Sequence, residues 1–200
     1  EIIRLTPDEV VRFLDVAQYG SKNFSWKQES YLEKTRERDY TMIVLMLSTG
    51  IRVSELVGLN CSDVHLDECR IVVRRKGGSI ANVYLSDEAH DTLEDYLKYR
   101  ETLKLDKDND ILFLSMQNKR IGVQSVENIV KKYAKAADID KKITPHKLRK
   151  TYGTELYKET GDIYLVASSL GHSSVETTTR HYAIQDELNK IEARNKVKLR

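Results

Sequence analysis

The most informative stretch of this sequence is Thr144-Pro145-His146-Lys147-Leu148-Arg149-Lys150-Thr151. Thr144 is a good helix N-cap and Pro145 suits the first helical position, so a helix is predicted to begin here. His146 and Arg149 then lie three residues apart on one face, near a helix end that favours anions. They pair a proton-transferring imidazole with a phosphate-binding guanidinium. The alternative is a solvated basic first turn, which is what most basic residues on helices form.

Composition describes one globular domain with a substantial core. The 200 residues are 40% hydrophobic and 32% charged, which is typical of a soluble protein. No apolar run approaches the roughly 18 residues that a membrane helix needs, so no membrane association is expected. Cys61 and Cys69 lack the spacing of a zinc site. We interpret both as free thiols in a reducing cytoplasm, which makes a cytoplasmic location the expectation.

Charge is distributed unevenly along the chain. Residues 131–200 hold 15 Lys and Arg against 9 Asp and Glu, whereas residues 1–130 hold 18 against 22. The basic C-terminal part indicates a polyanionic partner, although the signal is weak by itself.

The first third of the chain predicts two helices and a junction. A capping box at Thr6 opens a helix that ends near Gly20, residues 20–30 are predicted to be a loop, and a long helix runs from about Tyr31 to Gly50. Arg52 follows at once, at a junction between core elements. Glu55, three residues on, can hold the guanidinium in place. A purely structural Arg–Glu pair is the alternative.

Residues 69–84 predict a β-hairpin. Arg70 to Arg74 form one strand, Lys76-Gly77-Gly78-Ser79 the turn, and Asn82 begins the returning strand. Lys76 would lie at a mobile, exposed tip. An ordinary charged hairpin tip explains it equally well in isolation.

The remaining elements are predicted to be mostly helical. Helices are expected after the cap at Ser86, over Gln124 to Ala136, from a break at Gly161 up to Leu170, and from Ser174 through residues 177–182. Residues 111–114 are a short strand or extended segment. The fold class is therefore mainly α with a small antiparallel β-sheet.

The polar residues at element boundaries suit metal-free phosphoryl transfer. Two arginines can stabilise the charge that gathers on a phosphodiester under attack. A lysine can protonate the leaving alkoxide, and a tyrosine beside a base can be the nucleophile. The sequence contains no carboxylate cluster suited to magnesium and no phosphate-binding GxxxxGK[ST] loop. This pattern argues against a two-metal nuclease and an ATPase, and no metal or cofactor is expected.

Five segments resemble, in order and spacing, the catalytic domain of the tyrosine recombinases, the lambda-integrase and Xer family of site-specific DNA recombinases. They are TGIRVSEL (49–56), RRKGGS (74–79), HKLRKTYGTEL (146–156), LGHSS (170–174) and TTTRHYA (177–183). Each is weak alone, but the five together are highly specific, and their order and spacing agree across about residues 5–190, most of the chain. Lys150 departs from the pattern, because many relatives carry histidine there. We expect no effect on the chemistry.

The resemblance implies a role for each cationic residue of the set. Arg52 and Arg149 would clamp the scissile phosphate, with Glu55 supporting the site. Lys76 would be the general acid for the 5′-hydroxyl leaving group.

The resemblance also implies roles for two histidines and a tyrosine. His146 would transfer a proton near the nucleophile, and His172 would hydrogen-bond the phosphate. Tyr182 would be the nucleophile that forms a 3′-phosphotyrosine link. Because that link stores the broken bond, no ATP is needed.

The resemblance further implies a larger assembly. Residues 1–200 would be the C-terminal catalytic domain of a longer protein, without the N-terminal core-binding domain that closes around DNA. The expected partners are double-stranded DNA, three further subunits in a tetramer with C-terminal tail exchange, and a possible partner recombinase. Type IB topoisomerase-like DNA relaxation and an inactive DNA-binding relative are the alternative functions.

Overall fold

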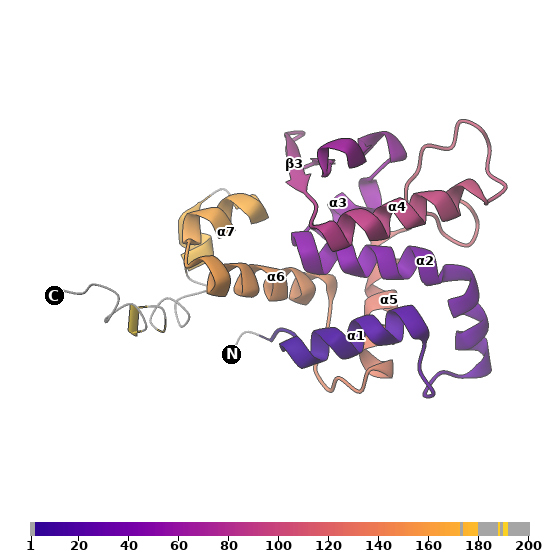
Figure 1. Ribbon diagram of the computed structural model, residues 1–200, viewed down its shortest axis with the longest axis horizontal. Helices are drawn as coiled ribbons and strands as arrows, with labels where there is room; N and C mark the ends of the chain where they lie inside the picture. The colour runs from indigo at the N-terminus through magenta and orange to yellow at the C-terminus, as the bar shows by residue number, and fades with distance from the viewer. Residues whose placement is uncertain (1–2, 173, 180–187, 189, 192–200) are drawn as a thin grey trace.

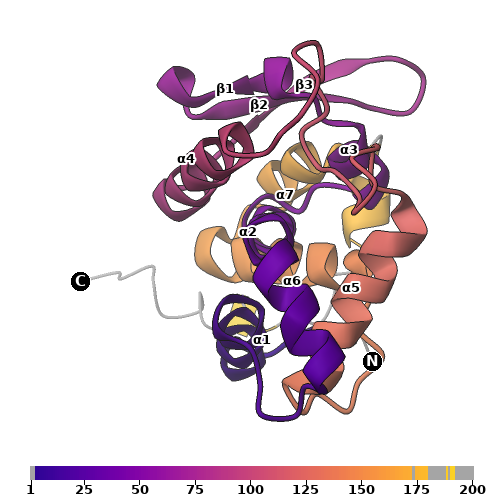
Figure 2. The same ribbon diagram turned by 90° about the vertical axis from the view of Figure 1, so that its right-hand side faces the viewer.

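Helix α2 (Trp26–Thr49) runs through the middle of the molecule and packs most extensively against three other helices (Figures 1 and 2). These are α1 (Pro7–Tyr19), α4 (Asp87–Glu101) and α6 (Pro145–Thr160). The computed structural model describes residues 3–172, 174–179, 188, 190 and 191. The second half of α2 is buried from Met42 to Met46, as its continuous apolar run predicts.

Helix α2 begins earlier than the sequence pattern indicates. The prediction of a loop over residues 20–30 and a helix from about Tyr31 is wrong, because the helix starts at Trp26. Ser25 is its N-cap. Its Oγ accepts from the backbone of Gln28, and the Gln28 side chain accepts from the Ser25 backbone N–H at 2.9 Å. This reciprocal cap stabilises a polar first turn that has no apolar periodicity.

The predicted hairpin is confirmed and belongs to a three-stranded antiparallel sheet. Its strands are β1 (Val64–His65), β2 (Arg70–Arg74) and β3 (Ile80–Tyr84) in that spatial order. The register pairs Ile71 with Val83, and both are buried on the face toward the helices. Alternation along β2 therefore buries one face and leaves Arg70 and Arg74 outside the core.

The cap at Thr144 and the break at Gly161 are confirmed as the ends of α6. Helix α7 (Ile163–Leu170) packs on α6 through a small cluster of its own, formed by Tyr157, Val166 and Leu170. Residues 175–179 form a further helical turn. The rest of the segment predicted to reach residue 182 lies outside the described residues.

Two further helices and the segment at residues 111–114 also belong to the fold. Helix α3 (Val53–Gly58) follows α2 directly, and α5 (Val123–Ala136) packs against α1, α3 and α6. Residues 111–114 have isolated bridges at Ile111 and Leu114 with a bend at residues 112 and 113 between them, so they form no continuous strand. Cys61 and Cys69 are free thiols. Within the described part of the chain, no helix is both long and apolar enough to cross a bilayer.

Candidate active site

A cationic cavity of about 1100 Å³ lies where α3 begins, the hairpin turns and α7 ends. Four permanent cations line it, together with His172 and a single carboxylate, Glu55, among the residues that the structure describes. The four cations are Arg52, Arg74, Arg75 and Lys76. Because positive charge exceeds negative charge on its walls, the cavity favours an anion.

Arg52 and Glu55 form the predicted pair at the start of α3. Arg52 is the N-cap residue of the helix, and its Nη1 donates to Glu55 Oε1 at 3.0 Å. Glu55 is buried, and its second oxygen accepts the Arg52 backbone N–H at 3.2 Å. The carboxylate thus fixes both the backbone and the guanidinium of Arg52 at the cavity wall.

Arg149 ties the ends of two helices together. It is only 7% exposed, and it donates to the carbonyl of Gly50 at 2.6 Å and to that of Leu170 at 2.5 Å. Gly50 is the C-cap of α2 and Leu170 is the last residue of α7. Arg149 therefore satisfies two carbonyl groups that helix ends leave without an intrahelical partner.

The two predicted arginines converge on neighbouring carbonyls. Arg149 binds the carbonyl of Leu170, while Arg52 Nη2 donates to the carbonyl of Gly171 at 3.4 Å. Residues that are far apart in the sequence thus meet at the end of α7. The structure brings Arg52, Lys76 and His172 to the cavity wall, and Arg149 binds the carbonyl of Leu170, the residue before the lining residue Gly171.

Two further predicted residues occupy different settings. Lys76 is exposed in the hairpin turn and lines the cavity. Gly77 and Gly78, which follow it, both have positive φ, so the turn needs their conformational freedom. His146 is exposed at the second position of α6, whereas Arg149 on the next turn is buried. His146 is not among the described residues that line the cavity.

His172 links the cavity to the segment that follows it. Its Nδ1 lies 2.7 Å from Oγ1 of Thr178, which is fully buried. This contact anchors the helical turn at residues 175–179 against the site. The predicted nucleophile, Tyr182, lies outside the described residues.

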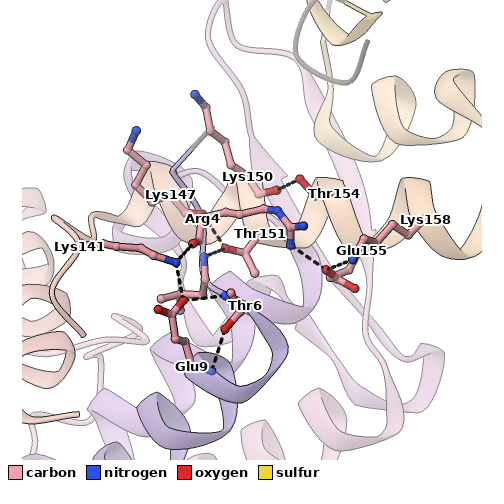
Figure 3. A network of polar contacts seen from close by, with 11 residues as sticks. Arg4, Thr6, Glu9, Lys141, Lys147, Lys150, Thr151, Thr154, Glu155 and Lys158 are labelled. Atoms are coloured by element: carbon pink, nitrogen blue, oxygen red, sulfur yellow. Dashed lines mark hydrogen bonds and ion pairs between the residues drawn. The ribbon is translucent and has the colours of Figure 1, made fainter. Parts of the chain in front are cut away.

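The segment before α1 holds α6 in place (Figure 3). The backbone N–H of Leu5 donates to Thr151 Oγ1 at 3.0 Å, and Arg4 pairs with Glu155 at 3.0 Å. Leu5 is fully buried. The helix that carries His146 and Arg149 is therefore fixed from its side by the N-terminal strap, residues 4–6.

Two lysines of α6 extend away from this strap (Figure 3). They are Lys147 and Lys150, three residues apart on the same helix face. Burial, and then the charge of Lys147, lowers the pKa of Lys150. This face of α6 is thus positively charged beside the predicted proton-transfer histidine.

Arg75 and Thr178 were not anticipated from the sequence. The signal for Arg75 was the run of three cations, Arg74 to Lys76, which ends in the glycine turn. For Thr178 the sequence offers no signal, because its contact with His172 depends on how the chain folds back after α7.

Comparison with known proteins agrees with this geometry. Residues 3–188 match the phage integrase family. The chain is a member of this family. A relative in it, the tyrosine recombinase XerS of Streptococcus uberis, is 38% identical over 186 residues, which cover 90% of this chain and 52% of that protein. The chain spans about half the length of the curated relatives it matches.

Solved structures of the family confirm the predicted fold. The XerA recombinase superposes with a TM-score of 0.79 at 31% identity, covering 98% of this chain and 66% of that chain. A XerH site-specific recombinase, solved as a post-cleavage complex with its difH substrate, gives a TM-score of 0.77 at 23% identity and covers 98% and 54%. The mainly helical fold with its small antiparallel sheet is thus that of tyrosine recombinases.

Proposed function

We propose that this chain is the catalytic domain of a site-specific DNA recombinase that cleaves and rejoins strands through a phosphotyrosine intermediate. The observation that carries the proposal is the convergence of Arg52 and Arg149 on the adjacent carbonyls of Leu170 and Gly171 beside a cationic cavity. The similarity to the recombinases XerS and XerA supports it, as does the likeness in fold to XerH, which was solved with its difH substrate.

The proposed reaction exchanges one phosphodiester for another. The Tyr182 oxygen attacks the scissile phosphorus, and the bond to the 5′ oxygen breaks. The tyrosine proton passes toward His146, while Lys76 protonates the departing 5′ oxygen. Arg52, Arg149 and His172 stabilise charge on the non-bridging oxygens. Attack by another 5′-hydroxyl reverses these steps, so no external energy source enters.

The larger setting is part of the same proposal. The domain acts within a longer protein whose N-terminal core-binding domain completes a clamp around double-stranded DNA. Four copies assemble on two sites and exchange their C-terminal tails, and a second recombinase can supply two of the copies. A domain of this kind acts on its target only when paired, which separates it from a topoisomerase that relaxes DNA alone.

Covalent capture tests the proposal. The chain is incubated with a random-sequence duplex library nicked at varied positions, so that cleavage traps the adduct, and products are separated on a denaturing gel. The unaltered chain should retain DNA, whereas Tyr182→Phe should retain none and still bind DNA, because only the hydroxyl is lost. A persistent adduct from Tyr182→Phe would show that another residue attacks.

Two other outcomes would favour the alternative functions. Rapid relaxation of a supercoiled plasmid that lacks the captured sequence would favour a topoisomerase. Failure of the unaltered chain to trap any duplex would favour an inactive DNA-binding relative.

A further inference from the structure

Arg75 stands out among the described cavity residues because its surroundings do not account for its charge. It follows β2 directly, and its side chain is 20% exposed. Its Nε is buried without a hydrogen-bond partner, and the nearest carboxylate oxygen, Glu55 Oε1, is 4.0 Å away. A buried guanidinium N–H without an acceptor is costly and uncommon, so it calls for an explanation.

Glu55 cannot supply the missing acceptor. Both of its oxygens already accept from Arg52, one from the side chain and one from the backbone. One carboxylate therefore faces two guanidinium groups, and one positive charge remains without compensation. Among the residues that the structure describes, no other acidic side chain lines this cavity.

Gly171 makes room for the guanidinium. A Cβ added at Gly171 would collide with Arg75 Nη1, and this glycine has a φ of +63°. Arg52 donates to the carbonyl of the same glycine. The guanidinium groups of Arg52 and Arg75 thus share two neighbours, Gly171 and Glu55, and one nitrogen of each lies within 4.0 Å of Glu55 Oε1.

We propose that Arg75 is a third arginine of the phosphate site and binds the same scissile phosphate as Arg52. The inference rests on the proposed function. Two guanidinium groups that approach one carboxylate oxygen are close enough to bind the oxygens of one phosphate, and guanidinium geometry matches a phosphate through paired N–H donors. Arg75 also follows a paired strand instead of lying at the hairpin tip, so it is held in place before DNA arrives.

The test uses Arg75→Gln, which removes the charge but keeps a polar side chain. The matched control is Arg70→Gln, which removes the same charge from β2 at a residue paired with Glu68 and outside the cavity. Both are made in a Tyr182→Phe background so that binding is measured without cleavage. The DNA is the captured site, with natural phosphates or with a neutral methylphosphonate at the scissile or a flanking position.

On natural DNA, Arg75→Gln should raise Kd roughly 10- to 150-fold, as expected for losing a hydrogen bond between charged groups. The slope of log K against log salt should fall by about one phosphate contact. With the methylphosphonate at the scissile position, the factor by which Arg75→Gln raises Kd should drop below about two. With the methylphosphonate at the flanking position, this factor should be unchanged. Arg70→Gln should change Kd by the same factor on all three substrates.

Arg75→Lys is the control for a folding defect, because it keeps the positive charge and loses the paired N–H donors of the guanidinium. It should show an intermediate penalty that is likewise confined to a natural scissile phosphate. A penalty of equal size on all substrates, or none, overturns the role of Arg75 and leaves the proposed function standing. A chain that traps no DNA at any site overturns both.

Discussion

Lys76 reaches the cavity from a turn that two glycines make possible. Its position is consistent with a general acid that engages its substrate only when DNA is bound, since Gly77 and Gly78 both have positive φ and lie in open space. The amine and the two arginines would then act on different oxygens. Lys76 would serve the bridging 5′ oxygen, whereas Arg52 and Arg149 would serve the non-bridging ones.

Lys76→Ala should slow cleavage by roughly 10²–10⁴, the usual contribution of a positioned proton donor. A substrate with sulfur at the 5′-bridging position has a leaving group that needs no proton, so it should restore the rate. Single-turnover cleavage of the captured site measures both effects. Arg149→Lys is the comparison, and sulfur should not rescue it. Rescue of both variants, or of neither, would contradict the role given to Lys76.

Asp39 is the centre of a buried ionic network away from the cavity. It is fully buried and accepts from Arg38 Nη2 at 2.7 Å and from Tyr133 Oη at 2.8 Å. Lys132 Nζ lies 3.5 Å away. Burial lowers the pKa of Lys132 more than the charge of Asp39 raises it. The folded state therefore disfavours the charged amine, while Arg38 already compensates Asp39.

Lys132→Met should raise the free energy of unfolding at pH 7 by about 1 kcal/mol or less, because it removes a desolvated amine while Arg38 still compensates Asp39. The folded amine loses its proton at a lower pH than the unfolded one. The unaltered chain should therefore gain stability relative to Lys132→Met as pH rises toward the ordinary lysine pKa. Urea unfolding at pH 7 and at pH 10 measures the difference. Lys131→Met, at an exposed neighbour, should show no such trend.

At the scale of elements, the site depends on the meeting of three helix ends. The C-cap of α2 at Gly50, the last residue of α7 and the buried Arg149 of α6 share two hydrogen bonds. Gly50 has a φ of +64°, and a Cβ there would lie 2.5 Å from Tyr152 Cδ1 and 2.8 Å from Leu170 Cδ2. Both backbone conformation and space therefore require glycine at this junction.

Gly50→Ala should lower the free energy of unfolding by about 2 kcal/mol or more, since left-handed strain and overpacking add. It should also reduce covalent capture of DNA by displacing the carbonyl that holds Arg149. Chemical denaturation measures the first effect. Gly58→Ala is the control, because Gly58 ends α3 with no atom within 4 Å of an added Cβ. This variant should gain roughly 0.5 kcal/mol in free energy of unfolding. Equal stability of the two variants would contradict this account of the junction.

At the scale of the whole molecule, positive charge is concentrated in the cavity and on one face of α6. The cavity carries Arg52, Arg74, Arg75 and Lys76, and α6 adds Lys147 and Lys150. The net charge of the chain is only +2. Attraction to the proposed DNA partner would therefore arise from local clusters of positive charge and not from the net charge of the chain.

DNA binding by this chain should weaken steeply with salt. Neutralising two or more phosphates should raise Kd at least about tenfold between 50 and 200 mM salt. Fluorescence anisotropy with a labelled duplex of arbitrary sequence measures this dependence. A Kd that stays level over the same range would contradict binding through phosphate contacts.

Much of the fold was predictable because its signals are local. The caps at Thr6, Ser86 and Thr144 and the break at Gly161 act through hydrogen bonds within a few residues, and the structure has all four. The sequence pattern did not predict the start of α2 after its N-cap, Ser25. Its cap is local too, but a polar first turn lacks the apolar periodicity by which helices are identified.

The sequence by itself predicted which residues the proposed site would contain, because the five motifs name them in order. Tertiary structure alone decided how they meet. The acceptors of Arg149 are 99 and 21 residues away along the chain, so its burial depends on the packing of α2 and α7 and not on its helix. The same holds for Arg75, whose uncompensated charge arises only because Arg52 occupies Glu55 and Gly171 admits a second guanidinium. Local hydrogen bonds can be predicted from neighbours in sequence, whereas competition for one carboxylate exists only after folding.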